Sequence, residues 1–485
     1  MQNNILYRTH DTKYHGLLLD TIPNYVSLVI APDASSNEYD IHEELHKRNI
    51  DVLVIDHHEA EQYSPYACVI NNQLCDYSNK QLSGVGMVYK FCCYIDSLLG
   101  VDYAQNMKDL VAVGMIADMM SLTSFETKEL IAQGLKTITN PFLNAIIERN
   151  EFQFKKGITP ERIAFYMAPL INAVSRAGTP QERRILLEAM LDYKAFLLIP
   201  STKRGCSGQT ETILEQAVRM CANVKSRQTR MRDNAIEIIE KQIESNHLLN
   251  NKILVVQLSP KDTVDKNLTG LIANELMSKY QRPVLILNYI KTDEGVFWVG
   301  SGRGFEKSKL KDFRKFLIDT GEIEWAQGHA NAFGCSISNE KIAHFIAVTN
   351  FLLGEFDFSP VYNVDFIYDS KRLNDIDIIG LASYEALWGQ GVDEPMVAIE
   401  NIRVSKSNLI RLGEKKDTLK ITLANGVELV KFKSSDEEYQ LLYSDLGCVI
   451  INVVGRCSIN TWAGETTAQI LIEDFELVKK EKYYF

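Results

Sequence analysis

Short apolar runs alternate with polar, helix-like stretches near the start of the chain. The run YVSLVIAPD (25–33) ends in an acid, and DVLVIDHH (51–58) ends in an acid and two histidines. YDIHEELHKRN (39–49), which lies between them, is polar and amphipathic. MKDLVAVGMIADMM (107–120) has the apolar spacing of a helix and again finishes near an acid, Asp118. Strand, helix and strand in such close succession predict a parallel α/β sheet.

The rest of the chain divides by its pattern into three stretches. From about residue 201 to 249 the sequence is long, polar and helical, without a strong strand signal, which is typical of a connector. A second α/β unit begins at KILVVQLS and closes with the glycine-rich stretch QGHANAFGCSI. Beyond about Phe356 the apolar residues alternate over short runs, and Asn425-Gly426 is a hairpin turn signal. This last stretch predicts a small β-barrel or sandwich.

Composition changes this picture only in part. The sequence has no run of about 18 apolar residues and no basic start followed by an apolar core, so neither a membrane span nor a secretion signal is expected. The nine cysteines include no Cys-x-x-Cys pair, and the adjacent Cys92 and Cys93 are expected to be buried thiols, which favours a reducing cytoplasm. The net charge of −11 argues against a general polyanion binder but allows a local basic channel. The basic residues between Lys203 and Arg232 are interpreted as a solvated helix face.

Acids and histidines gather where the predicted strands end. In parallel sheets, ligands bind outside the carboxyl ends of the strands. The residues at that end are Asp33, Asp56, His57 and His58, and Asp118 ends a neighbouring element. Mixed imidazole and carboxylate ligands suit manganese, magnesium or zinc, and carboxylates that bridge two ions suit phosphate-ester hydrolysis. The alternative is that these groups only cap and hydrogen-bond the strand ends.

A second histidine motif competes with this cluster. HEELH (42–46) has the H-E-x-x-H spacing of zinc proteases, in which both histidines bind the metal and the glutamate acts beside a metal-bound water. Here the motif lies on a short polar helix between two strands. We therefore interpret it as a solvated crossover helix whose resemblance to a zinc site is accidental.

Asp56-His57-His58 resembles the signature of the DHH phosphoesterases, which include RecJ-type single-strand exonucleases, phosphodiesterases of oligonucleotides or cyclic dinucleotides, and family II inorganic pyrophosphatases. The resemblance covers nearly the whole chain and is closest to the RecJ type. Six further stretches match the family's motifs in the same order: NKQLSGVGMVYKF, APLINAVSRAG, WVGSGRG, QGHANAFGCSI, ALWGQGVDEPMVAIENIRV and VVGRCSINTWAGETTAQILIEDFEL. The last two are similar to the RecJ oligonucleotide-binding-fold region.

The resemblance implies an α/β fold of four parts. A DHH phosphoesterase domain with a parallel sheet is expected at residues 1–195, and a connecting helix at 196–249. A second α/β domain, the DHH-associated domain, is expected at 250–355. A C-terminal β-barrel that resembles an oligonucleotide-binding fold is expected at 356–485.

The resemblance also implies roles for the strand-end residues. Metal ligation falls to Asp33, His57 and Asp118, with Asp33 bridging two ions, and the implied cofactor is Mn²⁺ or Mg²⁺. Asp56 and His58 are implied as catalytic residues that orient the ligand and approach the substrate phosphate.

Further residues are implied in the binding of nucleic acid. Arg303 is expected to pair with a backbone phosphate, and His329 is expected to reach the scissile phosphate. The remaining implied contacts are Asn172, Arg176, Ser301 and Gly328. From the residues alone, the favoured interpretation is that Arg303 is a surface residue after a strand and that His329 is a histidine that stabilises a turn.

The chain also departs from the family pattern. RecJ-type proteins begin with a strand that ends in Asp-x-Asp-Gly, and this sequence contains no such motif. The first strand and helix of the family's sheet are therefore expected to be absent, which leaves a single weakly held metal and reduced hydrolysis. His10, Asp11 and His15 are candidate substitute ligands. Smaller departures are Leu170 for an arginine, Ser175 for a glycine, and Gln327 for a glycine.

The resemblance implies a metal-dependent 5′→3′ exonuclease of single-stranded DNA that acts in DNA repair and recombination. Its partners would be single-stranded DNA and a helicase or single-strand-binding protein, and it would be a cytoplasmic monomer. Trp462 and Phe432 are candidate residues for base stacking in the barrel. One alternative is an inactive single-strand-binding or scaffold protein. The other is a phosphodiesterase of oligonucleotides or cyclic dinucleotides.

Overall fold

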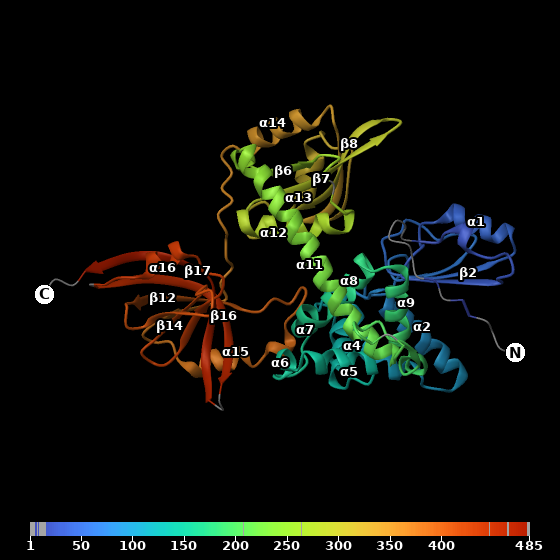
Figure 1. Ribbon diagram of the computed structural model, residues 1–485, viewed down its shortest axis with the longest axis horizontal. Helices are drawn as coiled ribbons and strands as arrows, with labels where there is room; N and C mark the ends of the chain where they lie inside the picture. The colour runs from blue at the N-terminus through green and yellow to red at the C-terminus, as the bar shows by residue number, and fades with distance from the viewer. Residues whose placement is uncertain are drawn as a thin grey trace. The chain divides into compact units, whose positions relative to one another are not determined.

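The computed structural model describes residues 5, 6, 8, 16–206, 208–262, 264–445, 447–462 and 465–482. His10, Asp11, His15 and the side chain of Trp462 lie outside this description. The chain forms two compact units (Figure 1). The first unit contains Met1–Asn172, Thr179–Cys221 and Asn363–Phe485, and the second contains Ala173–Gly178 and Ala222–Tyr362. The bounds of these two units differ from those of the four predicted domains, so the division into four domains stays a prediction.

The first unit opens with a three-stranded parallel sheet. Its strands lie in the order β1 (Leu28–Pro32), β2 (Asp51–Asp56) and β3 (Cys68–Asn71). Helix α1 (Tyr39–Lys47) crosses from β1 to β2, preceded in the chain by the short turn η1 (Leu19–Thr21). All pairings are parallel, which confirms the predicted sheet. The carboxyl ends of the strands, where the predicted site residues lie, consequently share one edge.

One face of this sheet carries a compact apolar core. Ala31, Val52 and Val54 are buried there against Leu45 of α1. Alternate residues of a strand point to opposite faces, so the periodicity of β2 directs Val52 and Val54 to the same side. The crossover helix is thus fixed to the sheet by burial of its apolar stripe, and this fixes the loop that joins β1 to α1.

A helical region follows the sheet. Its elements are α2 (Gly84–Leu99), η2 (Ala104–Met107), α3 (Lys108–Ala117), α4 (Phe125–Lys136), α5 (Pro141–Arg149), α6 (Glu151–Phe154), α7 (Pro160–Arg162), the π-helix η3 (Ile163–Met167), α8 (Ala168–Ala177), α9 (Pro180–Met190) and α10 (Asp192–Ala195). Asn140 and Thr179 cap α5 and α9 through their side chains, as their sequence positions before Pro141 and Pro180 favour. The expectation of buried thiols on α2 is wrong, because Cys92 is exposed and Cys93 is half-buried.

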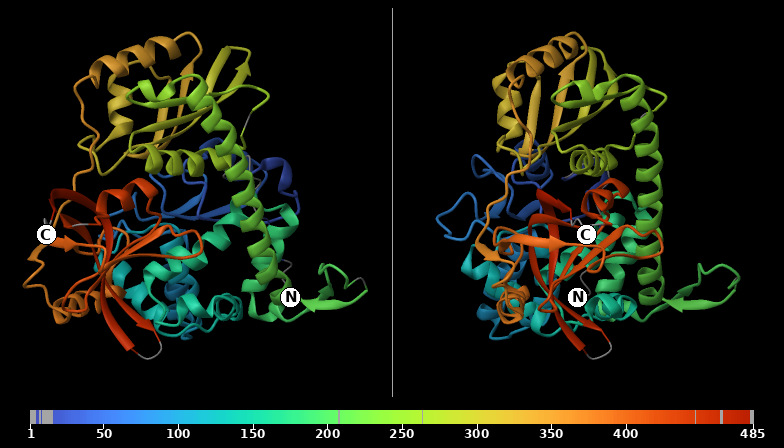
Figure 2. Two further views of the ribbon diagram at one scale, coloured as in Figure 1. Left: turned by 60° about the vertical axis from the view of Figure 1, so that its left-hand side comes forward. Right: turned by 90° about the vertical axis from the view of Figure 1, so that its left-hand side faces the viewer.

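The predicted connector differs from its expected form. A hairpin of β4 (Leu198–Pro200) and β5 (Thr210–Thr212) precedes the long helix α11 (Ile213–Ser245), and Figure 2 shows it projecting beside the first turns of that helix. Glu211 of β5 is buried and accepts hydrogen bonds from the guanidinium of Arg219, on α11, at 2.5 Å and 2.7 Å. The hydrogen bonds from Arg219 are the largest of the causes that lower the pKa of Glu211 to about 2. Part of the basic stretch is therefore structural rather than a solvated helix face.

The second unit is an α/β layer built on a five-stranded sheet. The strand order is β6 (Leu254–Leu258), β7 (Val284–Thr292), β8 (Gly295–Arg303), β10 (Ala332–Ser338) and β9 (Trp325–His329). Its other elements are η4 (Leu248–Asn250), α12 (Lys266–Tyr280), α13 (Phe313–Asp319) and α14 (Ile342–Leu352). One face packs on α11 and α12, and the other on α13 and α14. This confirms the predicted second α/β unit.

The C-terminal part of the first unit is rich in strands, as predicted. A seven-stranded sheet has the order β11 (Phe366–Asp369), β12 (Met396–Val404), β16 (Gly447–Trp462), β17 (Glu465–Lys482), β15 (Glu428–Lys431), β14 (Thr418–Thr422) and β13 (Leu409–Leu412). The helices here are α15 (Asp375–Ala382), η5 (Glu385–Leu387) and α16 (Asp436–Leu442). Antiparallel pairing of β14 with β15 confirms the hairpin at Asn425-Gly426. Phe432 is exposed, and the core consists of aliphatic residues such as Ile399, Ile421 and Ile451.

Polar contacts join this C-terminal sheet region to the helical region within the first unit. Arg162 of α7 forms an ion pair with Glu385 of η5 at 2.5 Å, and the backbone N–H of Leu122 donates to Gln390 O at 2.8 Å. Within the C-terminal region, Arg456 of β16 pairs with Glu394 at 3.6 Å, and Glu394 interacts electrostatically with Glu161 of α7. Because the two regions meet through charged groups, their contact is expected to depend on pH.

Glu394 sets the sign of this dependence. Burial raises the pKa of Glu394 to about 7; Arg456 opposes the rise, while Glu161 and Glu385 reinforce it. An acid whose pKa is higher in the folded state destabilises that state as pH rises from 4.5, its ordinary pKa, through 7, its pKa in the folded protein. We expect Glu394→Gln to stabilise the protein at pH 8 by about 1–3 kcal/mol and to have little effect at pH 5. Melting curves between pH 5 and 9 measure this, with exposed Glu400→Gln as the control; equal curves for the wild type and Glu394→Gln at pH 8 contradict it.

Candidate metal centre

Asp33 lies in a strained turn directly after β1. Its backbone has φ 61°, and Ser35 has φ 84°, both in the left-handed region that non-glycine residues rarely adopt. The Asp33 N–H donates to Ile55 O of β2 at 2.8 Å, which ties the turn to the neighbouring strand. The carboxylate lies against Gly84 at the start of α2, where a Cβ atom would come within 2.2 Å of Asp33 Oδ1. Glycine at position 84 is therefore required for this close approach.

Asp56 is the buried anchor of the DHH segment. It is 1% exposed, and its Oδ1 accepts hydrogen bonds from His57 N at 2.8 Å, from His58 N at 3.3 Å and from His58 Nδ1 at 2.7 Å. Its Oδ2 accepts from Ser36 N at 3.3 Å. Burial alone raises the pKa of a carboxyl, but the bonds from His58 and Ser36 outweigh it and hold the pKa of Asp56 well below its usual range. The hydrogen bond between His58 Nδ1 and Asp56 Oδ1 raises the pKa of His58.

His57 directs its ring toward two carboxylates. Its Nε2 lies 3.2 Å from Asp33 Oδ1 and 3.3 Å from Asp118 Oδ2. The His57 side chain is largely buried, whereas Asp33 and Asp118 are about half exposed. Asp118 follows the last residue of α3, so the helix end places it at this edge. The structure thus brings together the three residues that were predicted as metal ligands.

The donor set fits a divalent cation. One imidazole nitrogen carries one proton or one lone pair, so it cannot satisfy two carboxylates unless it is charged or a cation lies between them. Asp33, His57 and His58 can each offer one ligand atom, and these atoms lie within 4.8 Å of one another. Imidazole and carboxylate together suit Mn²⁺ or Mg²⁺. Within the described residues this is the one such group of three or more, so a second complete ligand set is not found there.

The HEELH segment forms the predicted crossover helix, but the prediction that it is solvated is wrong for His42. Helix α1 does cross between the strands, but His42 is not solvated: it is fully buried, and its Nε2 lies 3.2 Å from Ser35 Oγ. The Ser35 hydroxyl donates to Glu38 Oε2, so the imidazole nitrogen must donate to Ser35. This leaves His42 Nδ1 without a hydrogen-bond partner, and burial lowers the pKa of the ring. His46, on the other hand, is exposed and packs on the ring of Tyr66, so the two histidines form no zinc pair.

We expect His42 to support the metal centre through Ser35, two residues after Asp33. His42→Leu removes the bond to Ser35 and loosens the strained turn, so Mn²⁺ affinity is expected to fall about 10–100-fold. The free energy of unfolding should change by only about 1 kcal/mol, because the variant also removes an unpaired buried nitrogen. Calorimetric titration with Mn²⁺ and urea unfolding measure the two quantities. His42→Gln, which retains a donor, is the matched control, and unchanged Mn²⁺ affinity in His42→Leu contradicts the expectation.

The predicted residues Arg303 and His329 lie in the second unit, at one level of its sheet. Arg303 ends β8 and His329 ends β9, and both pair directly with Ala332 of β10 between them. Paired residues of neighbouring strands point to the same face, so the guanidinium and the imidazole flank a floor formed by Ala332. Gly328 of β9 has φ 128°, which favours glycine at this position of the strand. The structure therefore places these groups on one surface, with His329 exposed.

Arg303 belongs to a cluster of cations within the second unit. Burial lowers the pKa of Arg303, and the nearby charge of Arg176 lowers it further. Burial likewise lowers the pKa of Lys225, with contributions from Arg232 and Arg176. Like charges held together in a partly buried site favour an anionic ligand. Lys225 was missed as a candidate because its neighbours come from distant parts of the chain.

Hydroxyl groups extend this cluster. The hydroxyls of Ser301 and Thr269 lie 2.8 Å apart, and a Cβ atom at Gly270 would come within 2.6 Å of Arg303 Nη2. The predicted contact Ser301 is thus next to Arg303, as their alternation on β8 requires. Asn172, the remaining predicted contact, lies on α8 and is half-buried.

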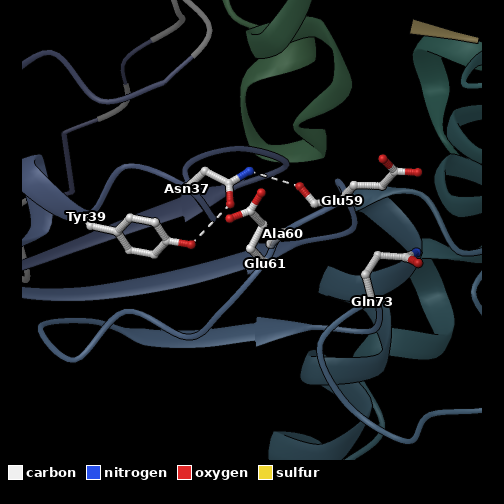
Figure 3. A pocket seen from close by; sticks show the side chains of 6 residues that line it. All are labelled: Asn37, Tyr39, Glu59, Ala60, Glu61 and Gln73. Atoms are coloured by element: carbon white, nitrogen blue, oxygen red, sulfur yellow. Dashed lines mark hydrogen bonds between the residues drawn. The ribbon is translucent and has the colours of Figure 1, made fainter. Parts of the chain in front are cut away.

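An open pocket of about 670 Å³ lies beside the DHH segment (Figure 3). The lining residues are Asn37, Tyr39, Glu59, Ala60, Glu61 and Gln73. Asn37 Nδ2 donates to Glu59 O at 2.9 Å, and Tyr39 OH donates to Asn37 Oδ1 at 3.3 Å. Two glutamates line the pocket, so it is a poor site for phosphate, and its hydrogen bonds instead hold the segment that follows His58.

Two family models match this chain. Residues 3–115 match the DHH family, N-terminal domain, and residues 372–474 match the RecJ OB domain. The first match contains Asp33 and the DHH segment. The second covers most of the seven-stranded sheet region.

Similar proteins agree with these matches. The chain is 38% identical over 483 residues to a protein of Bacillus subtilis (strain 168) that is named as an SPbeta prophage-derived single-strand DNA-specific exonuclease, YorK. The alignment covers 99% of this chain and 83% of that protein. It is 25% identical over 486 residues to the single-stranded-DNA-specific exonuclease RecJ of Haemophilus influenzae, covering 93% of this chain and 78% of the relative.

Two solved structures share the fold. RecJ of Thermus thermophilus in complex with Mn²⁺ aligns with a TM-score of 0.69 and 20% identity, over 93% of this chain and 62% of that one. The Mg²⁺ complex of the same protein aligns with a TM-score of 0.64 and 19% identity, over 93% and 61%. This chain spans less than two thirds of the solved chains.

Proposed function

Because this chain belongs to the RecJ-type single-strand DNA-specific exonucleases of the DHH phosphoesterase family, which are hydrolases, we propose that it removes nucleotides from single-stranded DNA in a metal-dependent reaction. The proposed polarity is 5′→3′. The observation that carries the proposal is the convergence of His57 Nε2 on Asp33 and Asp118 at 3.2 Å and 3.3 Å. These three side chains can share one cation, and a metal centre of this kind is suited to phosphodiester hydrolysis.

Asp33, His57 and Asp118 would hold Mn²⁺ or Mg²⁺, which supplies Lewis-acid activation of water and neutralises charge on the phosphate. Asp56 fixes His58 through its Nδ1, so the free Nε2 of His58 is presented toward the substrate. Asp56 also holds the backbone of His57. The buried, hydrogen-bonded carboxylate therefore orients both imidazoles.

The second unit would supply the binding of the strand. Arg303 offers its guanidinium fork to a backbone phosphate, and His329, exposed across Ala332, stabilises the charge that develops on the scissile group. Further contacts are assigned to Asn172, Arg176, Ser301 and Gly328. Lys225 adds a positive charge to the same cluster.

The biological setting follows from this chemistry. We propose a monomer that acts in DNA repair or recombination, in cooperation with a helicase or single-strand-binding protein that exposes the strand. The nine cysteines all lie in the described part of the chain and form no disulfide there, which is compatible with a reducing cytoplasm as its location. A membrane-crossing helix is not found in the described part of the chain.

A titration with Mn²⁺ tests the activity. A 5′-labelled single strand is incubated with the protein at increasing Mn²⁺, and release of the labelled mononucleotide is followed. We expect release that saturates with Mn²⁺, is abolished in Asp118→Ala, and is absent on blunt duplex. Binding without mononucleotide release, unchanged in Asp118→Ala, would contradict the enzyme.

A second candidate function has one observation in its favour. The described residues contain one group of candidate metal ligands, whereas a two-metal mechanism requires ligands for two ions. A protein that binds single strands without hydrolysis fits that observation. The Mn²⁺ titration separates the two functions. The match to the RecJ OB domain argues against a phosphodiesterase of short or cyclic substrates, because a barrel of this type serves to extend a DNA path.

A further inference from the structure

Two aromatic side chains are exposed on the π-helix η3. Phe165 is 67% exposed and Tyr166 is 43% exposed, although both lie within a well-packed helical region. The neighbours Ile163 and Met167 are fully buried, so the helical segment itself is firmly anchored. A π-turn inside a helix costs stability and is common at functional sites. The exposed phenylalanine on this π-helical turn is therefore a candidate contact for a ligand.

The surroundings hold the aromatic pair in place. Tyr166 packs edge-on against the buried ring of Phe154, with 6.2 Å between ring centroids. Arg162, one turn earlier, is buried and donates to Gly157 O at 2.9 Å while it pairs with Glu385. Phe165 is thus presented by a rigid base rather than by a loose loop, which lowers the entropy cost of binding.

The position of the pair relates it to nucleic acid. On one side, Arg162 and Lys156 contact the C-terminal sheet region, through Glu385 and Ile459 O, and that region matches the RecJ OB domain. On the other side, Asn172 lies seven residues after Phe165 in the helical segment formed by η3 and α8. The exposed Lys155 and Lys156 supply positive charge nearby. The surface therefore lies between two segments assigned to the binding of DNA.

We propose that Phe165, supported by Tyr166, is a stacking platform for a nucleobase of the single-stranded DNA substrate. The proposal rests on the proposed function and adds a base-contacting site to the phosphate contacts already described. Every base offers an aromatic face, so the platform would bind without sequence preference. A duplex keeps its bases stacked on one another and offers none to Phe165. The platform would therefore also favour single strands over duplex.

The test compares two ligands of equal length and charge. Fluorescence anisotropy measures the affinity of full-length protein for an oligothymidylate and for the same strand with abasic sites, in buffer with Ca²⁺ and without Mn²⁺. For Phe165→Ala we expect affinity for the oligothymidylate to fall about 5- to 150-fold, with little change for the abasic strand. Phe125→Ala is the matched control, because Phe125 is 84% exposed at the start of α4 and has no assigned contact. Phe165→Trp is expected to retain affinity, and its added fluorescence should be quenched by the oligothymidylate only.

The outcomes separate this inference from the proposed function. Equal losses for the two strands, a loss in Phe125→Ala as large as in Phe165→Ala, or no loss in Phe165→Ala each overturn the platform. A wild-type protein that does not bind the oligothymidylate overturns it as well. A wild-type protein that binds with the predicted base dependence but releases no nucleotide with Mn²⁺ overturns the exonuclease alone. Because Phe165 is exposed, melting temperatures of the variants should stay close to that of the wild type.

Discussion

Replacing His57 with glutamine is expected to reduce Mn²⁺-dependent nucleotide release by more than about 100-fold. The imidazole nitrogen is the group on which Asp33 and Asp118 converge, at 3.2 Å and 3.3 Å. Glutamine keeps the polarity and much of the volume, but its amide is a weak ligand and cannot hold the two carboxylates around a cation. The side chain is largely buried, so water does not easily replace it.

The measurement combines activity with metal binding. Release of a 5′-labelled nucleotide and calorimetric Mn²⁺ affinity should fall together in His57→Gln, whereas binding of single-stranded DNA in Ca²⁺ should change by less than about 5-fold. His46→Gln is the matched control, because His46 is an exposed histidine on α1 whose ring packs on Tyr66. Full activity in His57→Gln, with unchanged Mn²⁺ affinity, would remove this centre from the reaction.

Asp56→Ala is expected to cost stability as well as activity. The variant leaves the N–H groups of Ser36, His57 and His58 without their acceptor in a buried site, and it unfixes the His58 ring. We expect a loss of about 3–5 kcal/mol in the free energy of unfolding, because a buried charge and several of its bonds are removed at once. Urea unfolding without metal measures it. Asp51→Ala, at the exposed opposite end of β2, should change stability by less than about 0.5 kcal/mol.

The pH dependence of this variant has a definite sign. The pKa of Asp56 is held below its ordinary value of 3.8, so its contribution to stability is complete above that value and is lost as pH falls toward the lower folded value. The stability difference between the wild type and Asp56→Asn should therefore shrink below about pH 4. It should also shrink as pH rises above 6.5, because His58, whose pKa the Asp56 carboxylate raises, then loses its proton. A difference that stays constant from about pH 5 to 9 would contradict the assigned pair of a charged Asp56 and a charged His58.

The proximity of Asp33, His57 and Asp118 could be predicted in large part from the sequence. DVLVIDHH and the run ending at Asp33 are strand patterns of period two, and parallel strands bring their carboxyl ends to one edge. Asp118 was placed by the end of a helical pattern. These inferences use only local periodicity and one rule of sheet topology, so they hold without knowledge of side-chain packing.

The features that were missed depend on packing between distant residues. The burial of His42 results from its contact with the turn at Ser35, which no pattern on a polar helix reveals. The exposure of Cys92 depends on which face of α2 remains uncovered. The hairpin of β4 and β5 is held by the pair between Glu211 and Arg219, and its strands are too short to give a periodic signal. Charge clusters such as Lys225 with Arg176 likewise form only after folding.

The contact between Gly84 and Asp33 has a wider consequence. Position 84 bears no functional group, yet a side chain there would occupy the space of the Asp33 carboxylate. The composition of the centre is therefore defined by an excluded volume as well as by its donor atoms. A survey that counts only acids and histidines in related chains would classify a sequence with a larger residue at this position as intact. Its cation site would nevertheless be sterically closed, with every ligand still present.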